Sequence, residues 1–171
     1  MQGNRLRIEA INLHWLYEKE PVDVCAHGIV RVFHENEVVF EGEGDLTLST
    51  AALNLLRTLT RDYQASGQWG GQLIPCCGNF MVIAPETGLV ENCGCPTGVD
   101  WRITHRSGLV HIELSDERSI EVTEAEWADA VLNFSENVRS FYFRISRQPE
   151  PDDLEWHAAF VREWNSYHSL Q

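Results

Sequence analysis

The sequence contains no apolar run that approaches the roughly 20 residues needed by a membrane-spanning helix. It is also poor in positive charge: 13 Lys and Arg residues stand against 26 Asp and Glu, for a formal net charge of −13 at pH 7. Nucleic-acid-binding proteins usually concentrate Lys and Arg, because phosphate contacts supply much of their affinity. These shortages argue against a membrane span, and against nucleic acid and anionic membrane surfaces as partners.

A secretory signal and an even set of cysteines are absent as well. The N-terminal residues lead into alternating polar and apolar positions rather than into an apolar block with a small-residue cleavage site. The five cysteines form an odd set, and Cys76 and Cys77 are adjacent, whereas a disulfide-stapled secreted domain more often has an even, spaced set. We therefore expect a cytoplasmic protein with reduced thiols.

What is present is the composition of an ordinary globular domain. The chain has 171 residues, of which 43% are hydrophobic and 23% charged, enough for one core of normal size. We find no internal repeat and no low-complexity segment. We expect a single domain over residues 1–171, with a proline-containing break at 149–151 before the last helix.

The first part of the chain predicts β-strands. Apolar and polar residues alternate over 6–17, and the parity of the alternation changes near Ala10, which predicts a bulge there. Residues 28–34 and 37–41 form two short segments rich in β-branched residues, and the two residues between them predict the turn of a hairpin.

Two more hairpins are expected in the middle of the chain, over residues 80–90 and 101–114. In the second, a register that pairs His105 with Val110 places the bulky apolar groups on one face, as cross-strand packing requires. The same register places His111 on the more solvated face.

A helix is expected between the hairpin at 28–41 and the hairpin at 80–90, with Ser49 or Thr50 as its cap. Its apolar face, at spacings of three and four, consists of Leu53, Leu56, Leu59 and Tyr63. A longer helix is expected near the C-terminus, where Thr123 and Glu126 have the spacing of a capping box and apolar residues recur over 127–145.

A last helix is expected after the proline-containing break, capped by Asp152 or Asp153. Its apolar face is predicted to consist of Leu154, Ala158, Val161 and Trp164. Trp156 and Phe160 lie partly off that face, so we expect them to cover a second surface, either the long helix or the other subunit of a homodimer.

Strands come mostly first and helices mostly last, without the alternation of strand and helix typical of a parallel sheet. This order predicts an α+β fold: a mainly antiparallel sheet with helices packed on one face and two helices at the C-terminus.

The thiols are the most specific chemical feature. Three short segments at predicted loops or strand ends carry all five cysteines and one histidine, which is chemically sufficient for a tetrahedral zinc site. Adjacent cysteines rarely both reach one ion, so we take Cys25, His27, Cys77 and Cys95 as the candidate ligands, with Cys76 and Cys93 as alternates. The spacing differs from that of a standard zinc knuckle, and small residues buried at tight turns explain the same pattern.

A catalytic thiol is a third interpretation of these segments. Cys76 or Cys77 would then be the nucleophile, with His27, His105 or His111 as its base. The residues around the two cysteines match no nucleophile signature, and no glycine-rich phosphate motif occurs in the chain. The sequence therefore favours a protein that is not an enzyme.

Three stretches of the sequence resemble a family of small uncharacterised bacterial cytoplasmic proteins: residues 74–78, residues 94–101, and the ending that runs from Phe160 to Trp164 and Asn165. That family has no established activity, so the resemblance implies none. In size, acidity and α+β layout the chain is also similar to immunity proteins that neutralise bacterial toxins.

The function predicted from these features is a non-enzymatic, acidic protein-binding domain, of an immunity-like kind, whose partner is a basic protein. Opposite potentials speed the encounter of two such proteins, although acidity also serves solubility alone. The alternative is a zinc-binding domain or a metal- or thiol-dependent enzyme built on the cysteine and histidine set.

Overall fold

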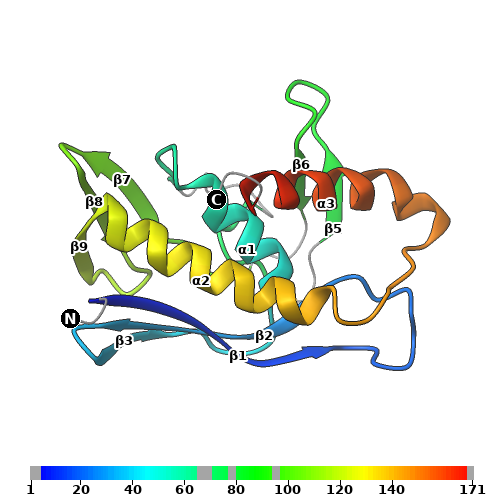
Figure 1. Cartoon of the computed structure of the whole chain (residues 1–171), viewed down its shortest axis with the longest axis horizontal. Helices are drawn as coiled ribbons and strands as arrows, with labels where there is room; N and C mark the ends of the chain where they lie inside the picture. Colours follow the sequence, from blue (N-terminus) through cyan, green and yellow to red (C-terminus); the bar gives the residue numbers. More distant parts are fainter. Residues whose placement is uncertain (1–4, 65–70, 77–79, 94–96, 169–171) are drawn as a thin grey trace.

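The computed structural model describes residues 5–64, 71–76, 80–93 and 97–168 (Figure 1). It confirms the predicted α+β class, with all strands paired antiparallel and two helices at the C-terminus. Over the described residues, the strands form three separate sheets rather than the one that was expected.

The first sheet is built from the N-terminal strands β1 (Leu6–Trp15), β2 (Ala26–His34), β3 (Glu37–Glu41) and β4 (Leu46–Thr47). β2 lies between β1 and β3, and its first residues pair with β4. The β2–β3 hairpin is confirmed, and both of its turn residues have positive φ, as a two-residue turn that follows the strand twist requires. The bulge in β1 lies around Asn12, slightly beyond the predicted position.

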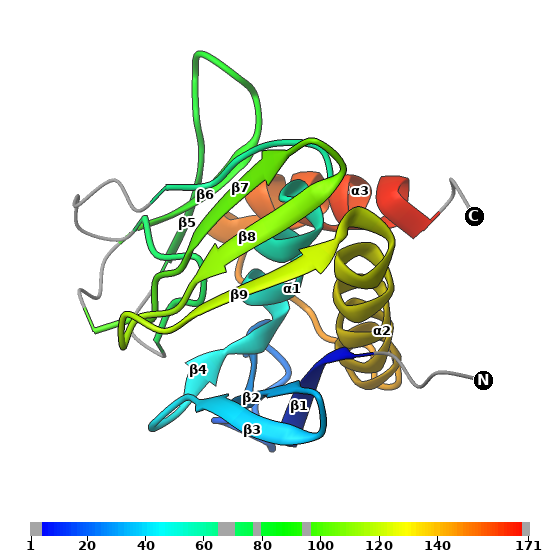
Figure 2. The same ribbon diagram turned by 90° about the vertical axis from the view of Figure 1, so that its left-hand side faces the viewer.

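Helix α1 (Leu48–Arg57) lies at the centre of the molecule (Figure 2). Its cap residue is Thr47, so the predicted caps Ser49 and Thr50 instead lie buried within its first turn. Eight of its ten residues are buried, which is the pattern of a helix covered on all sides rather than of an amphipathic surface helix. The helix ends before Tyr63, whose backbone instead pairs with Ile103.

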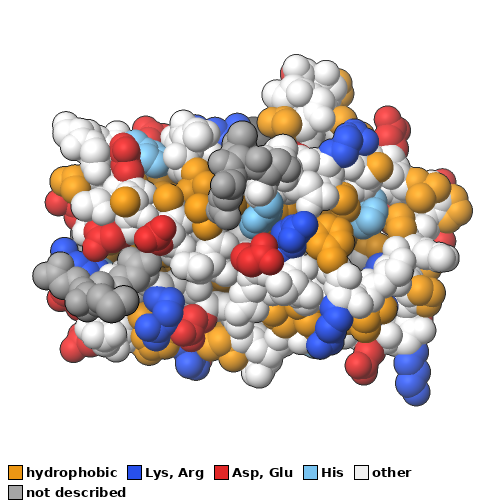
Figure 3. Space-filling model, in the orientation of Figure 1, with side chains coloured by type: hydrophobic (Ala, Val, Ile, Leu, Met, Phe, Trp, Pro, Cys, Tyr) orange, Lys and Arg blue, Asp and Glu red, His pale blue; other side chains and the backbone are white. Residues whose placement is uncertain are grey.

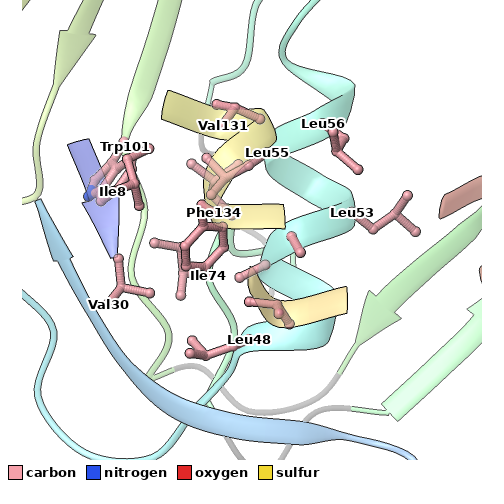
Figure 4. Close-up of a cluster of buried hydrophobic side chains, with 14 of the residues drawn as sticks. Ile8, Val30, Leu48, Leu53, Leu55, Leu56, Ile74, Trp101, Val131 and Phe134 are labelled. Atoms are coloured by element: carbon pink, nitrogen blue, oxygen red, sulfur yellow. The ribbon is translucent and has the colours of Figure 1, made fainter. Parts of the chain in front are cut away.

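Figure 4 shows how α1 fills the space between the other layers. Leu48 and Leu55 point toward side chains of the first sheet and of a second helix, whereas Leu53 and Leu56 project from the other side of α1, and all four belong to the buried core. One continuous cluster of buried residues includes contributions from every helix longer than one turn.

The second and third sheets follow α1. β5 (Phe80–Ile83) pairs with β6 (Val90–Cys93), as predicted. β7 (Arg102–Arg106), β8 (Leu109–Glu113) and β9 (Ser119–Thr123) form the third sheet, in that order. The predicted β7–β8 register is confirmed, because His105 lies opposite Val110.

Helix α2 (Glu124–Tyr142) crosses the face of the first sheet (Figure 1). Its predicted capping box is present, with the Thr123 hydroxyl accepting from the Glu126 backbone N–H and the Glu126 carboxylate accepting from the Thr123 N–H. The helix ends at Tyr142, so Ile145 is exposed rather than part of the packed face.

The last elements are the short 3₁₀ helix η1 (Pro151–Asp153) and helix α3 (Leu154–His168). The packed face of α3 differs from the predicted one: Ala159, Phe160 and Trp164 are buried, whereas Leu154 is 56% exposed. The difference arises because α3 packs against α1, β5 and β6 on one side and meets the end of α2 on another. Among the described residues, no helix has both the length and the apolar character needed to cross a bilayer.

Candidate functional site

A pocket of about 320 Å³ lies where the β1–β2 loop, β5 and the start of α3 meet. Three of its lining residues are aromatic and three are carboxylates, and a free cysteine and small apolar residues complete it. The lining residues are Tyr17, Glu20, Val22, Asp23, Val24, Cys25, Phe80, Met81, Asp153 and Trp156. We call this the acidic aromatic pocket.

The β1–β2 loop, which forms one wall, is held in place from a distant part of the chain. The Arg147 guanidinium donates to the Glu20 carbonyl at 2.6 Å and lies over the Trp15 ring, 4.2 Å from its centroid. The Gln148 N–H also donates to the Pro21 carbonyl at 2.9 Å. These contacts replace the regular hydrogen bonds that a loop lacks and fix its path.

Within this wall, the Asp23 carboxylate organises the loop backbone. One of its oxygens accepts from the Tyr17 N–H at 3.0 Å and the other accepts from the Cys25 N–H at 3.2 Å. A short polar side chain that accepts from its own loop backbone is a common way to stabilise a turn. The carboxylate is therefore held at the pocket wall by two donors of the loop itself.

Another part of the lining comes from η1 and the start of α3. The Trp156 indole Nε1–H donates to the Asp153 Oδ1 at 2.8 Å, so the ring and the carboxylate hold each other in place. Pro151 stands at the first position of η1, where its fixed φ favours the turn that presents Asp153.

Two of the pocket aromatics are unusually exposed. Tyr17 is 61% exposed and Phe80 is 59% exposed, and the exposed Leu154 directly follows Asp153 in the chain. Figure 3 shows hydrophobic side chains gathering toward the end of the molecule where α2 ends and α3 begins. Large apolar groups grouped on a surface are typical of interaction sites, whereas isolated ones are not informative.

The electrostatic field of the pocket is negative. Burial raises the pKa of the Cys25 thiol to about 12, and the Asp23 and Asp153 carboxylates add to the rise. The pKa of Tyr142 is raised as well, first by burial and then by Cys25 and Asp23. No Lys, Arg or His is among the described residues that line the pocket, so its carboxylates have no cation of the chain facing them across the cavity.

The cysteine and histidine set predicted from the sequence is only partly placed. Cys25 is free and lines the pocket, while His27 lies two residues on in β2, buried, with no hydrogen-bond partner for its Nδ1. Burial lowers the pKa of His27, so its ring is neutral at pH 7. Cys77 and Cys95 lie outside the described residues, and the part of the chain that is described holds no group of three or more metal-ligating side chains suited to an ion.

The alternates and the predicted bases lie elsewhere. Cys93 is a free thiol in β6, and burial raises its pKa. Cys76 is disulfide-bonded, so the expectation that the thiols are reduced is wrong for this residue. It would have to be reduced before it could act as a zinc ligand or a nucleophile. His105 faces the Asp62 carboxylate, with 3.1 Å between Nδ1 and Oδ1, and His111 lies 3.7 Å from Glu113.

A second, polar pocket of about 350 Å³ lies at the C-terminal end of α1. Its Arg57 guanidinium is fully engaged: two of its nitrogens donate to the Glu163 carboxylate at 2.7 and 2.6 Å, and the group also reaches the Val90 carbonyl at 2.7 Å. Its Tyr63 hydroxyl lies 2.7 Å from the Asp100 carboxylate. These groups tie α1, β6 and α3 together, so we interpret this pocket as structural.

Comparison with known proteins adds no assignment, because no protein-family model, curated protein or solved structure matches this chain. The acidic aromatic pocket is therefore the main indication of function in this protein. Sequence patterns did not identify its Tyr17, Asp23 or Phe80 as binding residues, and Asp153 was predicted only as a helix cap. The sequence did contain one indication, because Trp156 lies off the predicted apolar face of the last helix and shortly after Asp152 and Asp153. No nearby residue, however, links that segment to the β1–β2 loop.

Proposed function

We propose that this protein is a non-enzymatic binding domain and that its partner is a basic protein, which docks over the acidic aromatic pocket. The single observation that carries the proposal is the composition of that pocket, where exposed aromatic rings stand beside unneutralised carboxylates. Protein interfaces are enriched in aromatic residues at their centres, and complementary charge guides the partner to them.

Solubility alone explains a high negative charge, but it does not explain exposed aromatic rings. A surface selected only for solubility avoids large apolar groups such as Tyr17 and Phe80. The combination of the two features at one concave site is the reason we favour binding. The ionisation of the thiols agrees with a non-enzymatic role, since burial keeps Cys25 and Cys93 protonated at neutral pH.

The experiment is affinity isolation from the native cells with three forms of the full chain. The wild-type protein is expected to retain a basic protein at low salt and to release it as the salt concentration rises. Tyr17→Ser combined with Phe80→Ser is expected to lose that protein. Val38→Ser, a matched change at another exposed apolar residue on β3, is expected to retain it.

Melting curves of the three forms provide the folding control, because all three side chains are largely exposed and their replacement costs little stability. The proposal fails if the double variant retains the same protein as the wild type. It also fails if the wild type retains no basic protein at low salt.

A zinc-binding domain is the second candidate, and one observation favours it. The His27 Nδ1 is buried without a hydrogen-bond partner among the described residues, and a neutral imidazole nitrogen in that state is ready to bind a metal ion. Its ligands would be Cys25, His27, Cys77 and Cys95.

Elemental analysis of protein purified without added metal tests this second candidate. A structural site is expected to yield close to one zinc per chain, and chelator is expected to lower the melting temperature, because structural zinc contributes directly to folding. Less than about a tenth of an equivalent of zinc, with melting unchanged in chelator, would rule it out.

A further inference from the structure

We propose that the acidic aromatic pocket binds the guanidinium group of one arginine side chain. The inference deepens the proposed function and rests on it, because the arginine belongs to the basic protein partner. It names the chemical group that the pocket selects.

The size of the pocket fits a side chain. Its volume of about 320 Å³ is at the lower end of the range found for ligand pockets. The pocket is bounded by the β1–β2 loop on one side and by η1 and α3 on the other, both of which are held by the contacts described above. A single long side chain can enter such a cleft without a rearrangement of the backbone.

The carboxylates have capacity left for a cation. The Asp153 Oδ1 accepts from the Trp156 indole, and no donor within the described chain reaches its Oδ2. Each oxygen of Asp23 accepts one backbone N–H and retains a second acceptor position. Both carboxylates line the same pocket and therefore have acceptor positions left for the N–H groups of a planar cation.

The aromatic rings distinguish among cations. A metal ion is disfavoured, because the described residues contain no group of three or more suitable ligands. An organic cation is attracted by the faces of aromatic rings as well as by carboxylates. Arginine fits better than lysine, since its planar guanidinium stacks on rings, pairs with carboxylates through two parallel hydrogen bonds and is less strongly hydrated.

The test is an NMR titration of the full chain with N-acetyl-arginine amide, followed at the indole N–H signal of Trp156, which is assigned through Trp156→Phe. The matched probe is N-acetyl-citrulline amide, which has nearly the same shape and no charge. Arginine amide is expected to shift the signal saturably, and citrulline amide is expected to leave it in place.

Variants locate the binding. Asp153→Asn is expected to weaken the binding of arginine amide by about tenfold, because a charge-assisted hydrogen bond loses the negative charge of its acceptor. Glu20→Gln, at the exposed rim and outside the loop hydrogen bonds of Asp23, provides a second acidic variant that does not disturb the fold, with a smaller loss of affinity expected. Glu155→Gln, an exposed neighbour on α3 that does not line the pocket, is expected to bind as the wild type does.

The inference is overturned if the Trp156 signal does not respond saturably to arginine amide, or if citrulline amide or Asp153→Asn gives the same response. Its failure is distinguishable from failure of the proposed function. Retention of a basic protein without arginine binding would remove only the inference. Arginine binding without a retained protein would leave the pocket as a cation site and remove the protein partner.

Discussion

Replacement of Trp164 with alanine is expected to lower the free energy of unfolding by about 3–5 kcal/mol, as removal of a buried aromatic side chain does. Trp164 is fully buried, and its indole N–H donates to the Ser135 hydroxyl on α2 at 2.8 Å. Its ring also contacts those of Tyr142 and Phe160, with centroids 5.3 Å away in both cases. Urea unfolding of the purified variant measures the effect.

Leu154→Ala is the matched control for this prediction. The helical spacing in the sequence placed Leu154 on the same packed face as Trp164, but the residue is largely exposed. We therefore expect its replacement to change the unfolding free energy by less than about 0.5 kcal/mol. Equal losses in the two variants would show that α3 packs as the spacing predicted and that the orientation described here is wrong.

Truncation after Gln148 tests the same helix as a whole. It removes η1 and α3 and exposes the ring of Tyr142 together with the apolar side of α1. The shortened chain is expected to be unfolded or to aggregate. A monomeric product with an unshifted melting midpoint would contradict the expectation and would make α3 a dispensable appendage.

Glu163→Gln is expected to destabilise the protein by about 3 kcal/mol, because it leaves the Arg57 guanidinium buried without its counter-ion. The side chains of Arg57 and Glu163 are only 11% and 14% exposed, and they form a two-point ion pair between α1 and α3. Thermal and urea unfolding of the variant at neutral pH measure the loss.

The exposed pair of Arg102 and Glu113 provides the comparison, since its side chains are about half exposed. Loss of that pair through Glu113→Gln is expected to cost less than about 1 kcal/mol. Combined replacement of Arg57 and Glu163 by methionine is expected to recover much of the stability lost in Glu163→Gln, because no buried charge remains unpaired. A loss in Glu163→Gln no larger than that in Glu113→Gln would show that the pair is solvated.

Features that depend on neighbouring residues were predicted well from the sequence. The β2–β3 and β7–β8 hairpins follow from strand alternation and a short turn, and Ser107 and Gly108 have the positive φ that such a turn needs. The capping box at Thr123 follows from a spacing of three residues. Local hydrogen bonding decides these features, so a short stretch of sequence contains them.

The ends and faces of the helices were predicted less well. α1 ends at Arg57 because Tyr63 pairs with Ile103, a contact across forty residues of sequence. The buried face of α3 turns toward Phe160 because the helix packs on two sides, against α1 and against the end of α2. Periodicity identifies an apolar stripe, but it does not show which part of a broad stripe the neighbours cover.

The sequence by itself determined the α+β class, the excess of negative charge and the local turns and caps, because each depends on composition or on residues close in the chain. Only the tertiary structure decided which of the acidic residues lie together in a pocket. Asp23 and Asp153 are 130 positions apart, and they face one pocket because Arg147 and Gln148 bind the β1–β2 loop next to the start of α3. Such contacts form between groups distant in sequence, and no local pattern specifies which of them will meet.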